Sequence, residues 1–532
     1  MSNEETKKDL LSVLWSGADI LRSKMDANDY KDYLLSLVFY KYLSDSYLEK
    51  VYDLINDEQP ENLEDAQRAY EEVYLDEGID DLLQDLKETF HYLIPPDLTY
   101  QKMYTNVKEN KFKREDLQKA FNSIEESDPL FENLFDDVDL YSNRLGTGDM
   151  KQSATISELI REIANADLIH TGGDVLGDAY EYLIGQFASE TGKKAGEFYT
   201  PQGPAKILTQ IAIQGQEDKK GLTVYDCCMG SGSLLLNAKK YSREPEFIRY
   251  YGQELMTSTY NLARMNMFLH NIAPENQFLH NGDTLDADWP REEETEFDMV
   301  VMNPPYSAKW SAAEGFKSDE RFMNYALAPK SKADYAFLLH GFYHLKQTGT
   351  MAIVLPHGVL FRGAAEGKIR ETLLQDGSIY AVIGLPANMF YNTSIPTCIV
   401  VLKKHRKGRD VLFIDASKQF VKEKKQNFMN DEHIQHVLEL YSNRESVEKE
   451  AYLAEYKEIE ANDFNLNIPR YVDTFEEEEE IDLGVLTANI RETNIQIKES
   501  QTKLLAMMKE IHAEDREMQQ KLDAFITMME EM

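Results

Sequence analysis

Cysteine is scarce in this chain of 532 residues, which contains only Cys227, Cys228 and Cys398. Two of the three are adjacent and none has a C-x-x-C spacing, which argues against a disulfide scaffold and a zinc cluster. There is no run of roughly 18 apolar residues that could form a transmembrane helix, and the acidic start lacks the apolar stretch of a signal peptide. We therefore expect a cytoplasmic protein, in a reducing compartment, that holds no metal.

Positive charge is also scarce. The chain has 57 Lys and Arg against 94 Asp and Glu, and its net charge of −37 is the opposite of that of a free-standing nucleic-acid-binding protein. Of the four segments 1–150, 151–300, 301–425 and 426–532, only 301–425 carries a net positive charge, with 18 basic and 10 acidic side chains. If the protein contacts a polyanion, we expect the contact in this segment, with a partner supplying the rest of the positive charge.

The spacing of apolar residues changes along the chain. Up to residue 165 they recur at helical spacing, as at Leu10, Leu14 and Leu21, which predicts a helical N-terminal domain over 1–165. Over 166–425, short apolar segments alternate with helical ones, which predicts an α/β domain with a βαβ sheet covered by helices on both faces. The predicted strands are 222–225, 248–252, 299–302, 350–355, 381–385, 398–402 and 411–414.

A connecting segment over 426–482 leads to a tail over 483–532. In this tail one apolar position repeats every seven residues from Leu483 to Met532, while the companion heptad positions are mixed. Such a one-sided seam favours a long helix, or a broken pair of helices, that packs on a partner. An amphipathic helix folded back on its own domain is the alternative.

A glycine-rich turn follows the first predicted strand. It contains Asp226, Gly230, Ser231, Gly232 and Ser233, and a helical pattern comes next. Glycines at such a turn let the backbone approach a nucleotide-like ligand, and the N-terminus of the following helix offers free N–H groups. Because the full GxGxxG pattern is absent, an ordinary tight turn between strand and helix is the alternative.

Two acidic residues lie where later strands are expected to end. Glu254 comes 22 residues after Gly232. That is close to the spacing of about 20 at which an acid accepts the ribose hydroxyls of a nucleotide. Asp283 follows Asn281 and Gly282 and is placed to accept a hydrogen bond from an adenine amino group. A surface acid and a plain Asn-Gly turn are the respective alternatives.

The sequence Asn-Pro-Pro-Tyr, formed by Asn303, Pro304, Pro305 and Tyr306, follows the apolar strand over 299–302. Two prolines hold a rigid turn that continues neither a helix nor a strand. An amino group on an aromatic ring is a poor nucleophile, because its lone pair is delocalised. The Asn303 side-chain oxygen and the Pro304 carbonyl can each accept one of its N–H groups, which favours a tetrahedral nitrogen, while Tyr306 stacks on the ring. This predicts methyl transfer to an aromatic amine; a structural Pro-Pro turn is the alternative.

With these motifs the chain resembles the amino-methyltransferases that use S-adenosyl-L-methionine, and Asn-Pro-Pro-Tyr resembles their catalytic motif in its adenine-N6 form. Gly196–Pro201, Leu21–Asp26 with Tyr30–Tyr33, and Phe390–Thr397 narrow the resemblance to the modification (methyltransferase) subunit of type I restriction–modification enzymes. It covers essentially the whole chain. It implies a Rossmann-like S-adenosylmethionine methyltransferase domain, an α-helical N-terminal domain and a long C-terminal helical tail.

The resemblance also implies roles for single residues. Phe390, with Tyr391 as a rival, would be a second aromatic wall for an adenine extruded from the duplex. Thr200 and Pro201 form a suitable N-cap and first-turn pair for the next helix. The turn departs from the family in having Cys227 where proline is commoner, which bears on its local backbone shape. The residues implied to line the cofactor site are Glu197, Phe198, Tyr199, Thr200, Pro201, Gln202, Asp226, Gly230, Ser231, Gly232, Ser233, Glu254 and Asp283.

The predicted function is therefore that of the methyltransferase subunit of a type I restriction–modification system, which methylates adenine N6 in DNA with S-adenosyl-L-methionine. The resemblance implies a specificity subunit that reads the sequence and a restriction subunit as partners. Double-stranded DNA would be contacted mainly through the complex, and no membrane is involved. Protein-glutamine or RNA amino-methyltransferases, which also use Asn-Pro-Pro-Tyr, are one alternative, and a non-catalytic assembly module is another.

Overall fold

Two compact units, Met1–Asp473 and Thr474–Met532, make up the chain in the computed structural model. The structure describes residues 3–76, 78–170, 175–190, 199–286, 288–291, 294–390, 393–423, 426–474, 483–513 and 515–531. Within these ranges, no helix has the length and apolar character needed to cross a bilayer.

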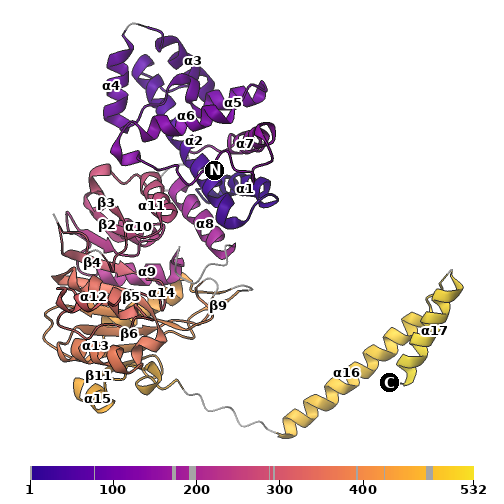
Figure 1. Ribbon diagram of the computed structural model, residues 1–532. Helices are drawn as coiled ribbons and strands as arrows, with labels where there is room; N and C mark the ends of the chain where they lie inside the picture. The colour runs from indigo at the N-terminus through magenta and orange to yellow at the C-terminus, as the bar shows by residue number, and fades with distance from the viewer. Residues whose placement is uncertain are drawn as a thin grey trace. The chain divides into compact units, whose positions relative to one another are not determined.

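Helices make up the first part of the larger unit (Figure 1). Leu14, Leu34, Val38 and Ile160 are fully buried in their common core, which confirms that the helical spacing of the sequence marks one apolar face of each helix. The helices are α1 (Asn3–Arg22), α2 (Ala27–Asn56), α3 (Leu63–Val73), α4 (Ile79–Phe90), α5 (Tyr100–Lys108), α6 (Arg114–Glu125) and α7 (Asp149–Ile163).

A nine-stranded sheet forms the centre of the α/β part, in the order β11-β8-β6-β7-β5-β4-β1-β2-β3. The strands β3, β2, β1, β4 and β5 are mutually parallel, whereas β7 runs antiparallel between β5 and β6. The strands are β1 (Thr223–Asp226), β2 (Arg249–Glu254), β3 (Gln277–Asn281), β4 (Phe297–Met302), β5 (Leu345–Pro356), β6 (Ile379–Gly384), β7 (Thr397–Lys403), β8 (Val411–Asp415) and β11 (Ala451–Ala454).

Helices cover both faces of this sheet, as predicted. One face shares a core with α9 (Gln202–Ile213), α10 (Ser233–Tyr241) and α14 (Asp431–Asn443). The other face packs on α12 (Asp334–Tyr343), α13 (Ala364–Gln375) and α15 (Tyr456–Ala461). Two further helices, α8 (Val175–Glu190) and α11 (Thr257–Leu269), contribute buried residues to the core of the N-terminal helices.

All seven predicted strand ranges are present. No range was predicted for β3, although a strand end was expected near Asp283, or for β11; these two strands form the edges of the sheet, and the hairpin of β9 (Val421–Lys422) and β10 (Asn427–Phe428) was also missed. Strand β3 lacks the signal used, a short continuous apolar run, whereas β11 is apolar (Ala-Tyr-Leu-Ala) but only four residues long and lies in the segment predicted to be a connection. In β3 no residue is fully buried, whereas every residue of the central strand β4 is. An edge strand needs less apolar sequence because part of its surface faces solvent.

The smaller unit is a broken pair of helices, α16 (Leu483–Lys509) and α17 (Arg516–Glu531). The seven-residue seam spans both, and Ile511 lies in the break between them. Leu483, Ile490 and Phe525 of this seam remain exposed. The division into four domains remains a prediction; within the predicted connecting segment over 426–482, β11 pairs with β8 of the main sheet.

Candidate active site

The carboxyl ends of four neighbouring parallel strands bring the predicted motifs together. The strands β3, β2, β1 and β4 lie side by side, and each ends just before or within one of the motifs. The glycine-rich turn follows β1, Glu254 ends β2, Asp283 comes two residues after β3, and Asn303 directly follows β4. This edge of an open parallel sheet is where such folds bind ligands.

The Asn303 side chain is nearly buried, with 3% of its surface exposed. Its Nδ2 donates a hydrogen bond to the Thr200 hydroxyl at 3.1 Å, and its Oδ1 accepts one from the Tyr306 hydroxyl at 2.8 Å. These two contacts set the orientation of the amide. Because a carbonyl oxygen has two lone pairs, Oδ1 can still accept a second N–H group beside that of Tyr306.

Thr200 is not the N-cap of α9, and this prediction was wrong. The helix begins at Gln202 with Pro201 as its N-cap residue. The Thr200 hydroxyl is instead the acceptor for Asn303, 103 residues further along the chain. A contact over such a distance cannot be read from local capping preferences.

Tyr306 and Phe390 lie in contact, with ring centroids 5.9 Å apart and ring planes at 80°. This edge-to-face geometry is favourable for an aromatic pair, but the rings would have to reorient to stack on opposite faces of one base. Burial, with the nearby Cys398 and Asp334, raises the pKa of Tyr306 well above its usual value, so its hydroxyl stays a donor to Asn303. The rival residue Tyr391 lies outside the described residues.

Backbone geometry in the glycine-rich turn requires its glycines. Gly230 and Gly232 have φ of 55° and 79°, in the left-handed region that favours glycine. A Cβ at Gly232 would also approach the Met267 side chain to 3.3 Å. Asp226 accepts a hydrogen bond from the Cys228 N–H at 2.9 Å, so an aspartate-closed turn forms here without the proline common in the family it resembles.

Glu254 is held against this turn. Its Oε2 accepts the Gly230 N–H at 3.1 Å, and its Oε1 accepts the Met256 N–H at 2.9 Å. The carboxylate therefore has a fixed orientation and is half-buried at the edge of the sheet. The Glu254 carboxylate lies beside the glycine-rich turn, and its role as acceptor of the ribose hydroxyls stays a prediction.

The other predicted cofactor residues are placed in different ways. Asp283 is exposed, and its side chain accepts the Leu285 N–H at 2.9 Å, as in an ordinary Asx turn. Gln202 donates to the Tyr199 hydroxyl at 3.3 Å, and the hydroxyls of Ser231 and Ser233 lie 3.0 Å apart in the glycine-rich turn. Glu197 and Phe198 lie outside the described residues.

Asn266 is a residue of this site that the sequence did not reveal. It is fully buried in α11, and its Nδ2 donates to the Ser231 carbonyl at 3.0 Å, which holds the glycine-rich turn from the side. No motif surrounds Asn266 in the sequence. The two residues are 35 positions apart, so only the packing of α11 against the turn identifies the contact.

The Asp226 carboxyl predicts a pH dependence. Burial, together with the charge of Glu254, raises the pKa of Asp226 from 3.8 to about 8. A raised pKa means that folding favours the protonated form. The Asp226 carboxyl therefore contributes fully to the free energy of unfolding below pH 3.8. This contribution declines as the pH rises and is lost once the pH passes about 8.

Asp226→Asn, which imitates the protonated carboxyl, should therefore gain Tm relative to the unaltered chain as the pH is raised from 5 to 8, with the gain levelling off above about 8. The measurement is thermal unfolding of both proteins across this range. A Tm difference that does not change with pH would show that Asp226 is ionised in the folded chain.

Among the described residues, one group of at least three His, Cys, Asp or Glu side chains has its ligand atoms close enough together to hold a metal ion. It consists of Asp288, His340 and His344. The Arg321 guanidinium already supplies a cation there, because its NH1 lies 3.1 Å from His340 Nδ1. His340 then donates from Nε2 to the Tyr225 hydroxyl at 2.8 Å. Burial lowers the pKa of His340 well below its usual value, in agreement with this neutral form. The position of His340 in this group is thus explained by its contacts with Tyr225 and Arg321.

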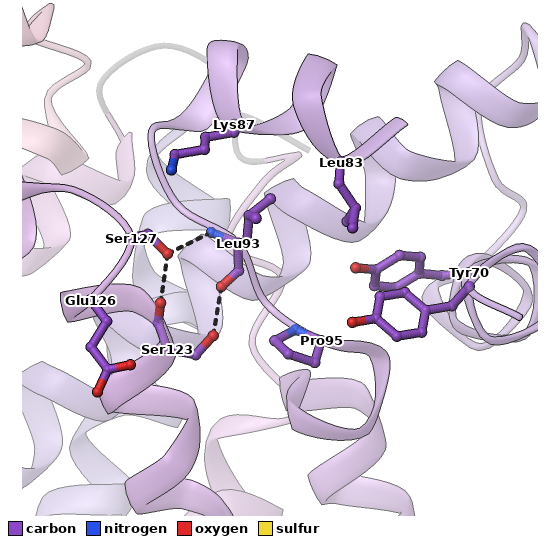
Figure 2. A pocket seen from close by; sticks show the side chains of 9 residues that line it. Tyr70, Leu83, Lys87, Leu93, Pro95, Ser123, Glu126 and Ser127 are labelled. Atoms are coloured by element: carbon purple, nitrogen blue, oxygen red, sulfur yellow. Dashed lines mark hydrogen bonds between the residues drawn. The ribbon is translucent and has the colours of Figure 1, made fainter. Parts of the chain in front are cut away.

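A cavity of about 330 Å³ lies in the helical N-terminal part, away from the strand ends (Figure 2). Its serines serve the backbone: Ser127 accepts the Leu93 N–H at 3.1 Å and Ser123 donates to the Leu93 carbonyl at 2.9 Å. The lining includes Lys87 and Glu126 but none of the residues predicted for the site. We therefore assign the candidate active site to the strand ends.

Comparison with known proteins gives two matching family models. One, described as N-6 DNA Methylase, matches residues 171–480, and the other, described as HsdM N-terminal domain, matches residues 10–163. The type I restriction enzyme MpnII methylase subunit of Mycoplasma pneumoniae is 36% identical over 95% of this chain and 97% of its own length. The MjaVIII methylase subunit of Methanocaldococcus jannaschii is 31% identical over 90% of this chain and 81% of its own.

A solved structure is similar as well. The type I restriction-modification system methyltransferase subunit from Streptococcus thermophilus is 60% identical in sequence to this chain, with a TM-score of 0.86. The match covers 88% of this chain and 100% of that one. The similarity thus extends over the helical part, the sheet and the strand ends together.

Proposed function

Since the chain belongs to the N-6 DNA methylase family, among the methylase subunits of type I restriction enzymes, we propose that it transfers a methyl group from S-adenosyl-L-methionine to adenine N6 in DNA. The observation that carries the proposal is the orientation of Asn303. Thr200 and Tyr306 fix its amide with the oxygen as an acceptor, at the strand end next to the glycine-rich turn.

The chemistry follows from this acceptor. In our proposal, Asn303 Oδ1 and the Pro304 carbonyl each accept one N–H of the adenine amino group. Holding both hydrogens favours a tetrahedral nitrogen, whose lone pair then becomes available for attack. Tyr306 or Phe390 stacks on an adenine that has left the duplex. On attack, the bond between the methyl carbon and the sulfonium sulfur would break, and the cationic nitrogen that results would lose one proton to solvent water. Because that nitrogen is acidic, no strong base is needed.

The residues at the glycine-rich turn fit S-adenosyl-L-methionine. In our proposal, Glu254 accepts the ribose hydroxyls, Asp283 accepts the adenine amino group, and the glycine-rich turn, whose Gly230 N–H is bonded to Glu254, contacts the polar remainder through Ser231 and Ser233. The positive φ of both glycines supports this placement, because a turn of this shape brings backbone N–H groups close to a ligand. When bound, this cofactor supplies an electrophilic methyl group on a sulfonium.

Methylome sequencing of a host with and without the gene, together with its partner subunits, tests the proposal. We expect N6-methyladenine at one sequence motif, present only with the gene. Transfer of labelled methyl to a protein glutamine or to RNA in place of DNA would favour the alternative enzymes. Cofactor binding without any turnover in the full complex would favour a non-catalytic module.

We propose further that a specificity subunit reads the DNA sequence and that a restriction subunit joins the complex. The charge of −37 supports dependence on such a partner, because phosphate contacts need positive charge. The exposed apolar residues of α16 and α17, among them Leu486 and Ile490, offer a surface on which another chain can pack.

The purified chain alone should therefore bind DNA negligibly. We expect affinity at physiological salt no tighter than non-specific binding, with a Kd of about 10⁻⁴ M or weaker, and specific binding only with the specificity subunit. Fluorescence anisotropy with a target duplex and a scrambled duplex, with and without the partner, measures both. Tight, sequence-specific binding by the chain alone would contradict this dependence.

A further inference from the structure

The catalytic turn ends in a strained residue. Ser307, directly after Tyr306, has φ of 53°, in the left-handed region that residues other than glycine rarely adopt. Such a conformation is strained and persists only when the surroundings hold it in place. The course of the turn from Asn303 to Ser307 therefore depends on what holds its end.

Asp334 contacts this end. The Ser307 N–H donates to Asp334 Oδ1 at 2.7 Å. Asp334 is the first residue of α12 and is 1% exposed. A carboxylate at a helix N-terminus is favoured by the helix dipole, and a charged acceptor makes a stronger hydrogen bond than a neutral one. Asp334 is thus a rigid acceptor behind the catalytic turn.

A second contact fixes Asp334 itself. Arg362 donates from NH1 to Asp334 Oδ2 at 3.0 Å and to Glu366 Oε1 at 3.0 Å. Glu366 lies in the first turn of α13 and is 3% exposed. One guanidinium thus joins two buried carboxylates from two helices, and neither carboxylate has a part in the chemistry proposed above.

We propose that Asp334 is a positioning residue for methyl transfer, which acts through Ser307 to hold the Asn303–Tyr306 turn and is itself held by Arg362. The inference rests on the proposed function. Its physical basis is that Oδ1 of Asn303 and the Pro304 carbonyl belong to one short turn and must meet the two hydrogens of a single amino group. A misplacement of about 1 Å is enough to cost on the order of 10²-fold in rate.

The test uses Asp334→Asn in the full complex with the specificity subunit and target DNA. Asparagine keeps an acceptor for Ser307, but its NH₂ group faces the Arg362 guanidinium, so the pair is broken. We expect the single-turnover rate of methyl transfer to fall by about 10- to 100-fold. The Kd for S-adenosyl-L-methionine and the KM for DNA should change little, since Asp334 is not among the residues proposed to bind either of them.

Asp298→Asn is the matched control. Asp298 is also fully buried and accepts from the Thr223 N–H at 3.1 Å and the Thr223 hydroxyl at 3.0 Å, but it lies near the start of β4, at the opposite edge of the sheet. The Asp298→Asn variant should lower the Tm and leave the rate of methyl transfer per folded molecule unchanged. If Asp334→Asn fails to fold, Arg362→Gln breaks the same pair from its exposed side and should give the same selective loss of rate.

An Asp334→Asn complex with an unchanged rate per folded molecule would overturn the positioning role. So would a loss of rate fully explained by weaker cofactor binding. Failure of the proposed function is a different result, since the unaltered complex would then methylate no adenine before any variant is compared.

Discussion

Replacing Asn303 with alanine is expected to lower the rate of methyl transfer by about 10²–10³-fold, the loss typical of removing one preorganised hydrogen-bonding group from an active site. The variant lacks the oxygen that we propose as the acceptor for an N–H group of the target amine. Single-turnover methylation of a target duplex by the complex measures the rate, and calorimetry measures cofactor binding. The Kd for S-adenosyl-L-methionine should be nearly unchanged, because Glu254 and the glycine-rich turn remain in place.

Thr200 offers a graded variant of the same test. Thr200→Val removes the acceptor for Asn303 Nδ2, so the amide can rotate and present its NH₂ group to the target amine. We expect a smaller loss than for Asn303→Ala and near-complete recovery in Thr200→Ser, which restores the hydroxyl.

Asn261→Ala is the control for these variants, since Asn261 is a nearly buried amide in α11 that donates to the Asn133 carbonyl at 2.9 Å. It should affect stability and not the rate per folded molecule. Full activity of Asn303→Ala would remove the basis of the assignment.

Replacing Glu254 with alanine is expected to raise the Kd for S-adenosyl-L-methionine by about 10²-fold or more, since a hydrogen bond to a charged group contributes about 1.5–3 kcal/mol and the ribose offers two hydroxyls. The same change removes the acceptors of the Gly230 and Met256 N–H groups, which loosens the turn. Calorimetric titration of the chain with S-adenosyl-L-methionine measures this affinity. The rate at saturating cofactor should fall far less than the affinity.

Glu275→Ala is the matched control for Glu254, as Glu275 is an exposed glutamate just before β3 and has no contact with the turn among the described residues. It should leave the Kd unchanged. Equal affinities of Glu254→Ala and the unaltered chain for S-adenosyl-L-methionine would refute the ribose assignment. A loss of rate without a loss of affinity would indicate that Glu254 acts in the chemical step and not in cofactor binding.

The number of basic residues in a segment does not show where those residues lie in the fold. Residues 301–425 are net positive and contain both Asn303 and Phe390, which favoured this segment as a DNA contact. Five of its 18 basic residues lie in the turn from Lys403 to Arg409. Because β7 runs antiparallel to β5, with Lys403 opposite Thr350 and Thr397 opposite Pro356, this turn lies at the edge of the sheet remote from Asn303. Only the direction of β7 separates these charges from the site.

The sequence by itself determined the elements and the motifs, because both follow from local patterns. Apolar runs marked the buried central strands, and the prolines and glycines after β4 and β1 marked turns with restricted or unusual backbones. The family resemblance rested on the same short motifs. Half-buried edge strands such as β3 were not predicted, because their apolar pattern is weak.

Tertiary structure alone decided which groups meet. The parallel order β3-β2-β1-β4 places residues 226, 254, 283 and 303 at one edge. The contacts of Asn303 with Thr200, of Ser231 with Asn266 and of Ser307 with Asp334 join residues 103, 35 and 27 positions apart. Hydrogen bonds depend on distance and direction in space, and a one-dimensional pattern contains neither once the chain separates the partners by more than a few turns.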